Sequence, residues 1–281
     1  MEGGIRLRGT WRQKREEGMI RVAVNGACGR MGSKIASLVC KDKGLELVAA
    51  LEREGHPLLG KDVGSLVGEG ELGVKVTDTL NGKADVLIDF SEPSSSVAKA
   101  ALCASKGIAL VVGTTGHTEE QLASIKKSSQ RIPCLISPNM SLGVNLLFQT
   151  AAQIAMALGE DYDIEIVEVH HRFKKDAPSG TALKLAQEIC KATGRELKEA
   201  AVYGRQGITG ERPKGQIGLH ALRVGDTVGD HKVIFGTLGE TIELVHSAHS
   251  RDTFALGAIR AAKFLAGKPP GLYEMRQVIS L

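Results

Sequence analysis

Residues 20–32 read Ile-Arg-Val-Ala-Val-Asn-Gly-Ala-Cys-Gly-Arg-Met-Gly, and this stretch decides the fold class. The β-branched run Ile20–Val24 predicts a strand, the glycines after it predict a tight turn, and apolar residues at helical spacing from Met31 to Val39 predict a helix. A bare glycine turn between a strand and a helix lets backbone N–H groups at the helix N-terminus reach a dinucleotide pyrophosphate. The spacing Gly-x-x-Gly-x-x-Gly is one residue longer than the commoner fingerprint, so the loop needs support from its surroundings.

The acidic residue expected behind such a loop is present. Glu52 lies twenty residues beyond Gly32, at the end of the second predicted strand, where a partner for a ribose hydroxyl belongs. Arg53 follows it, and a guanidinium there would offset the 2′-phosphate of NADPH or stack on adenine. A glycine turn that only packs a helix on a strand, beside a solvated charge pair, is the alternative. We favour a site for NADH or NADPH.

Further strand-like and helix-like segments alternate after this unit. Apolar runs at 45–51, 86–90, 108–112 and 134–136 predict strands, and the stretches between them predict helices. Near-continuous apolar strands alternating with helices are typical of a parallel sheet covered on both faces. We therefore expect a doubly wound, Rossmann-like α/β domain over residues 19–140.

Two turns follow strands of this domain, at the edge where ligands bind in open α/β sheets. They read Gly113-Thr114-Thr115-Gly116 and Pro138-Asn139-Met140-Ser141. Each taken alone fits an ordinary turn as well. Their shared position predicts that both line one ligand crevice.

The pattern changes after residue 140, which predicts a second domain of the α+β class over residues 141–251. Its strand-like stretches mix polar and apolar residues and are separated by glycine turns, as in an antiparallel or mixed sheet with one solvated face. The expected helices span 142–158 and 181–193, and the expected strands span 162–169, 217–224, 232–237 and 241–247. A last apolar-striped helix at 252–266 is expected to pack back on the first domain.

The composition limits the classes of partner. Of 281 residues, 36 are basic and 32 are acidic, which gives a formal net charge of +4, and the basic residues are interspersed instead of forming a stripe. One Trp, three Tyr and six Phe offer little surface for base stacking, so we expect no nucleic-acid partner. No apolar run approaches 18 residues, so we also expect no membrane span.

Cysteine usage and the N-terminus bear on the compartment. The five cysteines are scattered, with no Cys-x-x-Cys pair, which predicts free thiols in a reducing cytosol. They are Cys28, Cys40, Cys103, Cys134 and Cys190. Residues 1–18 lack the apolar segment of a secretory signal, and we predict a disordered extension ahead of a start at Met19.

The second chemical motif spans residues 168–182 and reads Glu-Val-His-His-Arg-Phe-Lys-Lys-Asp-Ala-Pro-Ser-Gly-Thr-Ala. It leaves a predicted strand, gathers two histidines, one arginine and two lysines, and opens a helix at Ser179-Gly180-Thr181. A helix N-terminus beside a cationic cluster makes an anion site that suits carboxylates. Because neighbouring side chains on an extended segment point to opposite faces, His170 and His171 are not expected to share a metal ion, and no metal is predicted.

Together these motifs resemble the 4-hydroxy-tetrahydrodipicolinate reductase family, formerly called dihydrodipicolinate reductase, of bacterial lysine and diaminopimelate synthesis. The resemblance runs from about Met19 to the C-terminus and is carried by VAVNGACGRMG, ALEREG, IDFSEP, VVGTTG, SPNMSLGVN and above all EVHHRFKKDAPSGTA. It implies hydride transfer from NADH or NADPH to a small cyclic dicarboxylate, with loss of water. It also implies a Rossmann-like domain completed by residues 252–281, and a mixed-sheet domain that builds a homotetramer in the cytoplasm.

The resemblance also implies roles for single residues. His170 matches the catalytic histidine and Lys174 the proton-donating lysine, whereas His171, Gly180 and Thr181 match contacts to the substrate carboxylates. The matched nucleotide-binding positions are Gly26, Ala27, Cys28, Gly29, Arg30, Met31, Glu52, Arg53, Gly113, Thr114, Thr115, Pro138, Asn139, Met140 and Ser141. The departures are Pro138 where Ala is frequent, Phe173 inside the cluster and the N-terminal extension, and none of them removes a catalytic group.

Two other classes of function fit parts of the sequence. A Rossmann dehydrogenase acting on an amino-acid semialdehyde would share the glycine loop, and so would a non-enzymatic nucleotide-sensing regulator. Neither accounts for the His-His-Arg-x-Lys cluster beside Ser-Gly-Thr, and no DNA-reading module is visible.

Overall fold

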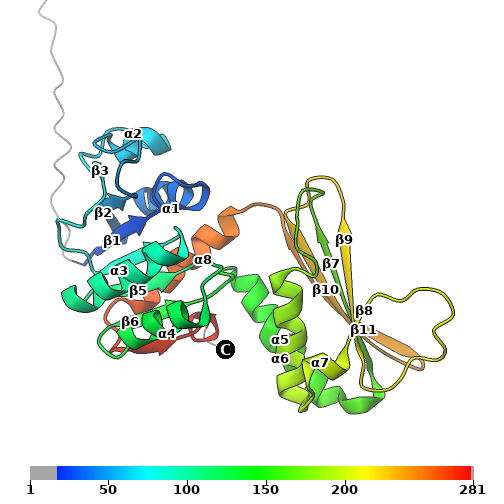
Figure 1. The fold of residues 1–281 in the computed structure, drawn as a ribbon. Helices are drawn as coiled ribbons and strands as arrows, with labels where there is room; N and C mark the ends of the chain where they lie inside the picture. The colour runs from blue at the N-terminus through cyan, green and yellow to red at the C-terminus, as the bar shows by residue number, and fades with distance from the viewer. Residues whose placement is uncertain (1–17, 280–281) are drawn as a thin grey trace, which may run out of the picture.

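The computed structural model describes residues 18–279, which form two sheets with helices packed on them (Figure 1). The first sheet has seven parallel strands in the order β12-β6-β5-β4-β1-β2-β3. They are β1 (Ile20–Asn25), β2 (Leu45–Leu51), β3 (Val76–Thr77), β4 (Val86–Asp89), β5 (Ala109–Val112), β6 (Pro133–Ile136) and β12 (Gly271–Tyr273). Apart from the added β12, this is the strand order of a doubly wound dinucleotide-binding fold, so the predicted fold class is confirmed. The extension predicted for residues 1–18 lies, except for Gly18, outside the described residues.

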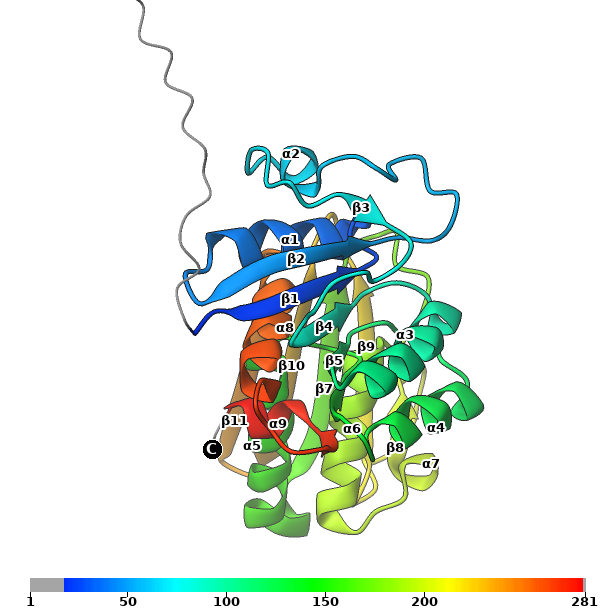
Figure 2. The same cartoon turned by 90° about the vertical axis from the view of Figure 1, so that its left-hand side faces the viewer.

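Helices cover both faces of the parallel sheet (Figure 2). One face shares a core with α1 and α8, and the other shares a core with α3 and α4. The helices of this part of the chain are α1 (Arg30–Lys41), α2 (Val63–Val67), α3 (Pro93–Lys106), α4 (Glu119–Ser128), α8 (Asp252–Leu265) and α9 (Met275–Ile279). Since α8 packs on this sheet and β12 pairs with β6, the C-terminal segment returns to the first domain after the second one.

The second sheet is mixed, in the order β11-β10-β7-β9-β8, as the alternating polar and apolar pattern predicted. Strands β7, β9 and β8 run parallel, whereas β10 pairs antiparallel with both β7 and β11. The elements are α5 (Leu142–Leu158), η1 (Gly159–Asp161), β7 (Asp163–His170), α6 (Gly180–Thr193), α7 (Leu197–Ala200), β8 (Ala201–Tyr203), β9 (Ile217–Arg223), β10 (Gly229–Thr237) and β11 (Glu240–Ala248). Helices α5 and α6 share a core with one face of this sheet and lie between it and the first domain (Figure 1).

Strand β7 carries the pattern that leads to the site. Its side chains alternate between partly exposed and buried, and the buried set is Ile164, Ile166, Glu168 and His170. The first two belong to the core under α5 and α6. Because side chains two residues apart share a face of a strand, the polar pair at the end of β7 points to the same side as the apolar pair before it.

Within residues 18–279, one helical stretch, which begins with α5, is long and apolar enough to cross a membrane. The stretch Leu142–Asp161 is 20 residues long, with a mean hydropathy of 1.3 in its most apolar window, so by length and composition it is able to cross a membrane. The helix was predicted over 142–158, and scattered Asn, Gln and Thr residues interrupt its apolar run. In the fold, Leu147, Phe148 and Ala151 of this helix pack in the core with α6 and β7. One face of the stretch therefore packs in the core of the second domain, and 28% of its most apolar window is buried.

The remaining differences concern strand bounds and short elements, and β10, predicted over 232–237, begins at Gly229. The predicted strand at 86–90 ends at Asp89, and β7 reaches one residue further than predicted, to His170. Helices α2, α7 and α9 and strands β3, β8 and β12 were not predicted. They span two to five residues each, which is too short for a periodic pattern.

Candidate functional site

The glycine turn after β1 leaves room only for backbone. Gly26 has a φ of +75°, and a Cβ atom there would lie 2.3 Å from the carbonyl oxygen of Phe90. A Cβ atom at Gly32 would lie 2.0 Å from the carbonyl oxygen of Gly26, so α1 approaches the turn this closely only with glycine at that position. Gly29 is the N-cap of α1 and offers no side chain to the N–H groups of the first turn. The turn is therefore shaped to present backbone donors to an anion.

Glu52 follows β2 directly and faces this turn. Its Oε1 accepts the backbone N–H of Cys28 at 2.8 Å, and its Oε2 lies 3.3 Å from the backbone nitrogen of Arg53. Burial, and then the charge of Glu52, raise the pKa of the Cys28 thiol to about 11, so the sulfur is protonated at neutral pH. Ala27 is buried in the core below the turn, and Arg53 is exposed beside the carboxylate. The acid predicted to hold a ribose hydroxyl thus lies against the glycine turn.

A cleft of about 460 Å³ opens at the carboxyl ends of the parallel strands. Residues from three of the predicted nucleotide-binding stretches form its wall, namely Arg30, Met31, Gly113, Thr114, Thr115, Pro138, Asn139 and Met140. Three residues that were not predicted also line it, namely Phe90, Ser91 and Phe254. The predicted residues outside its wall are Gly26, Ala27, Cys28, Gly29, Glu52, Arg53 and Ser141.

A buried carboxylate fixes one wall of this cleft. Asp89, the last residue of β4, is fully buried and accepts hydrogen bonds from the side chains of Asn25, Ser91, Ser96 and Thr114. The bonds from Asn25 and Thr114 measure 2.6 and 2.9 Å. Since Asn25 ends β1 and Thr114 follows β5, one carboxylate ties three neighbouring strands together where they meet the ligand. The Thr114 hydroxyl is therefore engaged by the protein itself.

The turn Pro138–Ser141 connects the cleft to the second domain. Asn139 donates from Nδ2 to Oγ1 of Thr181 at 3.1 Å, and its Oδ1 accepts the backbone N–H of Ser141 at 2.9 Å. Ser141 is fully buried, and its hydroxyl caps α5 by accepting the N–H of Val144 at 3.3 Å. A residue predicted to bind the nucleotide is thus bonded to one predicted to bind the substrate.

Glu168 joins the end of β7 to neighbouring elements through hydrogen bonds to its carboxylate. Only 1% of it is exposed, and it accepts Nη1 and Nη2 of Arg223 at 2.9 and 3.0 Å and the backbone N–H of Ser179 at 3.0 Å. Its Oε2 also accepts Nδ1–H of His170. An ionised carboxylate only accepts hydrogen bonds, so this contact places the ring proton on Nδ1 and leaves Nε2 for a substrate. Burial would raise the pKa of Glu168, but the bonds from Arg223 and His170 outweigh it and lower that pKa.

His170 is a neutral imidazole at pH 7. Burial, together with the charges of Lys174 and Arg223, lowers its pKa more than the hydrogen bond and the charge of Glu168 raise it. The ring of His231 packs edge-on against it, with the centroids 5.2 Å apart, and Nε2 of His231 lies 3.2 Å from Oγ of Ser179. Burial is the main cause that lowers the pKa of His231 to about 3. The neutral rings of His170 and His231 and the ionised carboxylate of Glu168 therefore lie together at the end of β7.

The other predicted substrate-site residues gather around the end of β7 and the start of α6. The side chain of Lys174 is 20% exposed, and its Nζ lies 2.9 Å from Oδ2 of Asp176. The ring of His171 lies beside that of Phe173, with the centroids 6.2 Å apart. Gly180 is exposed in the first turn of α6, where backbone N–H groups have no partner within the helix. These cationic and backbone donors thus lie on the one segment between the end of β7 and the first turn of α6, and such donors suit an anionic ligand.

Two family models cover most of the chain. The model for the N-terminus of dihydrodipicolinate reductase matches residues 20–140, and the model for its C-terminus matches residues 143–279. The chain belongs to the dihydrodipicolinate reductase family. The resemblance read from the motifs is confirmed, and the chain is an NAD(P)H-dependent oxidoreductase.

Individual relatives agree along nearly their whole length. The 4-hydroxy-tetrahydrodipicolinate reductase of Anaeromyxobacter sp. (strain Fw109-5) is 52% identical over 266 residues, which cover 94% of this chain and 98% of the relative. That of Syntrophus aciditrophicus (strain SB) is 47% identical over 264 residues, with 93% and 98% covered. The structure of dipicolinate-bound dihydrodipicolinate reductase from Paenisporosarcina sp. TG-14 matches with a TM-score of 0.72 at 28% identity, covering 91% of this chain and 97% of that one.

Sequence reasoning missed the residues that support the site from behind. Glu168 stands in the quoted motif, and its even spacing from Ile164 and Ile166 was a readable signal that it faces inward. Arg223 and Asp89 gave no such signal. Their partners come from strands that meet only in the folded sheets.

Proposed function

We propose that this protein reduces 4-hydroxy-tetrahydrodipicolinate to tetrahydrodipicolinate with NAD(P)H, with loss of water, in diaminopimelate and lysine synthesis. One observation carries the proposal beyond family membership. The His170 ring, fixed by Glu168, stands beside the start of α6, and that helix start is bonded through Thr181 to Asn139 in the wall of the cofactor cleft. The hydrogen bond between Asn139 and Thr181 therefore links the groups suited to proton transfer to the cleft suited to a nicotinamide cofactor.

The glycine turn fits a dinucleotide. A Cβ atom at Gly26 or Gly32 would clash with the backbone of Phe90 or of the turn itself, so glycine keeps the turn tight and its backbone donors suit a pyrophosphate. Glu52 offers an acceptor to a ribose hydroxyl. When bound, the cofactor supplies the hydride. The stretches that would hold it are Gly26–Met31, Glu52–Arg53, Gly113–Thr115 and Pro138–Ser141. Because Arg53 and Arg30 offset a 2′-phosphate while Glu52 favours a free hydroxyl, we propose that the protein uses both NADH and NADPH.

The substrate is a small ring with two carboxylates. Free N–H groups of Gly180 and Thr181 at the start of α6, together with the His171 side chain, would bind these carboxylates. The related Paenisporosarcina enzyme has been solved with dipicolinate, a planar cyclic dicarboxylate, which supports this class of ligand.

We assign the proton-transfer roles to Lys174 and His170. As hydride arrives, negative charge develops in the ring conjugated to the imine, and an ammonium group at Lys174 stabilises that charge and donates a proton. The neutral His170 accepts a hydrogen bond at Nε2 and, when it takes up a proton, Glu168 stabilises the imidazolium. Solvent can restore the proton on Lys174, because its partner Asp176 is 63% exposed.

An assay of hydride consumption tests the proposal. The full chain is mixed with NADH or NADPH and the cyclic dicarboxylate, and the oxidised cofactor and the product are quantified. We expect turnover with this substrate and none with aspartate semialdehyde. Turnover with the semialdehyde alone would assign the chain to the dehydrogenases instead.

We also propose a homotetramer built through the second sheet. Its face away from α5 and α6 carries Val169, Leu222, Ile234 and Val245, which the strand register places on one side. Leu222 and Val245 are 43% and 58% exposed on this face, and a partner chain packed there would bury them. Self-pairing of this face about one two-fold axis gives a dimer, and a second two-fold contact completes the tetramer. Light scattering should give a tetramer mass for wild type and a smaller mass for Val245→Asp. Five free cysteines fit a cytoplasmic location.

A further inference from the structure

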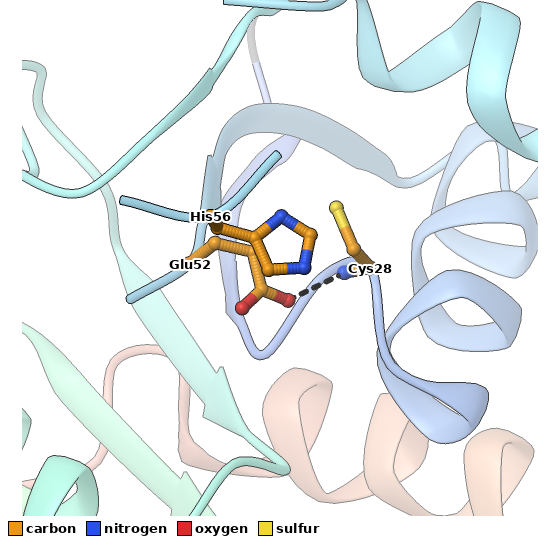
Figure 3. A group of neighbouring side chains, drawn as sticks. All are labelled: Cys28, Glu52 and His56. Atoms are coloured by element: carbon orange, nitrogen blue, oxygen red, sulfur yellow. Dashed lines mark hydrogen bonds between the residues drawn. The ribbon is translucent and has the colours of Figure 1, made fainter. Parts of the chain in front are cut away.

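Cys28, Glu52 and His56 form a group of side chains that the proposed reaction does not use together. Figure 3 shows the three pointing into one space, from the glycine turn, the end of β2 and the loop after it. The thiol sulfur, a carboxylate oxygen and an imidazole nitrogen all lie within 4.8 Å of one another. Each of the three residues is partly exposed, so the group is accessible from solvent.

The donor set selects the kind of ion. Thiolate, imidazole and carboxylate are the three protein ligands of Zn²⁺, with bonds of about 2.0–2.3 Å in a tetrahedral arrangement. Such bonds place ligand atoms about 3.3–3.8 Å apart, so the group would contract by about an ångström to close on the ion. His56 lies on a loop next to exposed Gly55 and Pro57, where such a shift moves no packed core. The Cys28 thiol, which is protonated in the free protein, releases its proton to solvent when the ion binds. The resulting thiolate and one carboxylate then balance the charge of the ion.

We propose that Cys28, Glu52 and His56 form a zinc site, with water as the fourth ligand, and that zinc and the dinucleotide exclude each other there. The mutual exclusion of zinc and the dinucleotide rests on the proposed function, in which Glu52 binds a ribose hydroxyl. A carboxylate oxygen engaged by zinc can no longer accept that hydroxyl, and the ion itself occupies space against the turn. The site would therefore let a thiophilic metal inhibit the enzyme.

Zinc binding changes two contacts. Oε1 of Glu52 keeps the N–H of Cys28, whereas Oε2, which accepts the N–H of Arg53 at 3.3 Å, turns to the metal and loses that bond. The imidazole Nδ1 of His56 accepts the N–H of Leu58 at a long 3.3 Å. With zinc on Nε2, the ring proton moves to Nδ1 and this bond is lost, a small cost against three bonds to a metal.

Direct metal titration of the full, tag-free chain tests the site. Zn²⁺ is added in competition with a chromophoric chelator, and Co²⁺ is added while the thiolate-to-cobalt charge-transfer band is recorded. We expect one site per chain that shows this band, weakened at least tenfold in both Cys28→Ser and His56→Gln. Cys40→Ser is the matched control, another partly buried cysteine of the same domain outside the group. A cobalt spectrum without the thiolate band, or unchanged zinc affinity in Cys28→Ser or His56→Gln, would overturn the site.

Cofactor binding in the same samples tests the exclusion. The apparent Kd for NADH should rise in proportion to free zinc in wild type and should stay constant in His56→Gln. If zinc binds but leaves the NADH affinity unchanged, exclusion is refuted and the zinc site stands on the first measurement. If wild type binds no NADH even without zinc, exclusion fails together with the proposed function, and the metal titration still decides the site.

Discussion

Replacing Glu168 by glutamine tests whether the carboxylate behind His170 serves catalysis. The amide keeps the shape of the side chain but has one acceptor oxygen, where the carboxylate accepts two bonds from Arg223 and one each from Ser179 and His170. In either orientation, the NH₂ group of glutamine faces a donor. With the amide oxygen toward Ser179, the NH₂ group meets Nδ1 of His170 and forces the ring proton onto Nε2, the nitrogen assigned to the substrate.

The structure sets the size of both expected effects. Breaking a buried ion pair costs about 3–5 kcal/mol, and we expect about 3 kcal/mol because the side chain of Arg223 is 21% exposed. For a chain of this size, that lowers Tm by about 6–12 °C. A carboxylate-to-amide change behind a catalytic histidine costs up to about 10⁴-fold in kcat in a protease triad. Since Lys174 shares the proton here, we expect a loss of about 10–10²-fold, or about 1.4–2.7 kcal/mol.

Glu165→Gln is the matched control for this change. Glu165 lies on the same strand but on its outer face, and it too accepts bonds from arginine and histidine, namely Arg205, Arg212 and His220. We expect both variants to lose stability in thermal unfolding and only Glu168→Gln to lose kcat, measured at a temperature where both are folded. A normal kcat in folded Glu168→Gln, or an equal loss in Glu165→Gln, would refute the positioning role.

Four further outcomes are expected. Lys174→Met should lower kcat by about 10²–10⁴-fold with unchanged cofactor affinity, and the double variant with His170→Gln should lose less than the product of the single losses. Near-normal kcat in both single variants would remove the catalytic assignment. His171→Gln should mainly raise KM for the dicarboxylate, and a pure kcat effect would speak against a carboxylate contact. Wild-type kcat/KM for NADH and NADPH should agree within about a hundredfold, or about 2.7 kcal/mol, and Glu52→Ala should shift the ratio toward NADPH. The pKa of Glu165 is lowered to about 2 from 4.5: burial would raise it, but bonds from Arg205, His220 and Arg212 outweigh that. This carboxylate therefore stabilises the fold above pH 4.5, and about 3 kcal/mol should be lost as pH falls toward 2. Urea unfolding across that range should show a shallower loss in Glu165→Gln.

The sequence predicted what depends on local pattern. The glycine turn, the acid after β2 and the long helices could be read from spacing, because each is set by residues close together in the chain. The supports of the site could not be read this way. Arg223 reaches Glu168 only because β9 pairs in parallel with β7, with His170 opposite Arg223. The same holds for Asp89, whose donors Asn25 and Thr114 lie 64 and 25 residues away.

The position of the site follows from how β7 ends. An inward-facing apolar position can be satisfied by any side chain of suitable volume, whereas an inward-facing carboxylate is stable only when every lone pair has a donor. Glu168 and His170 follow two core isoleucines on the same face of β7. The buried carboxylate of Glu168 therefore needs donors, which are an arginine from the next strand and a free N–H from the start of α6. These demands fix β9, β7 and α6 relative to one another at the point where the strand leaves the core. The histidine is thus oriented by interactions that also hold the second domain together, and a variant that frees the ring should loosen the domain with it.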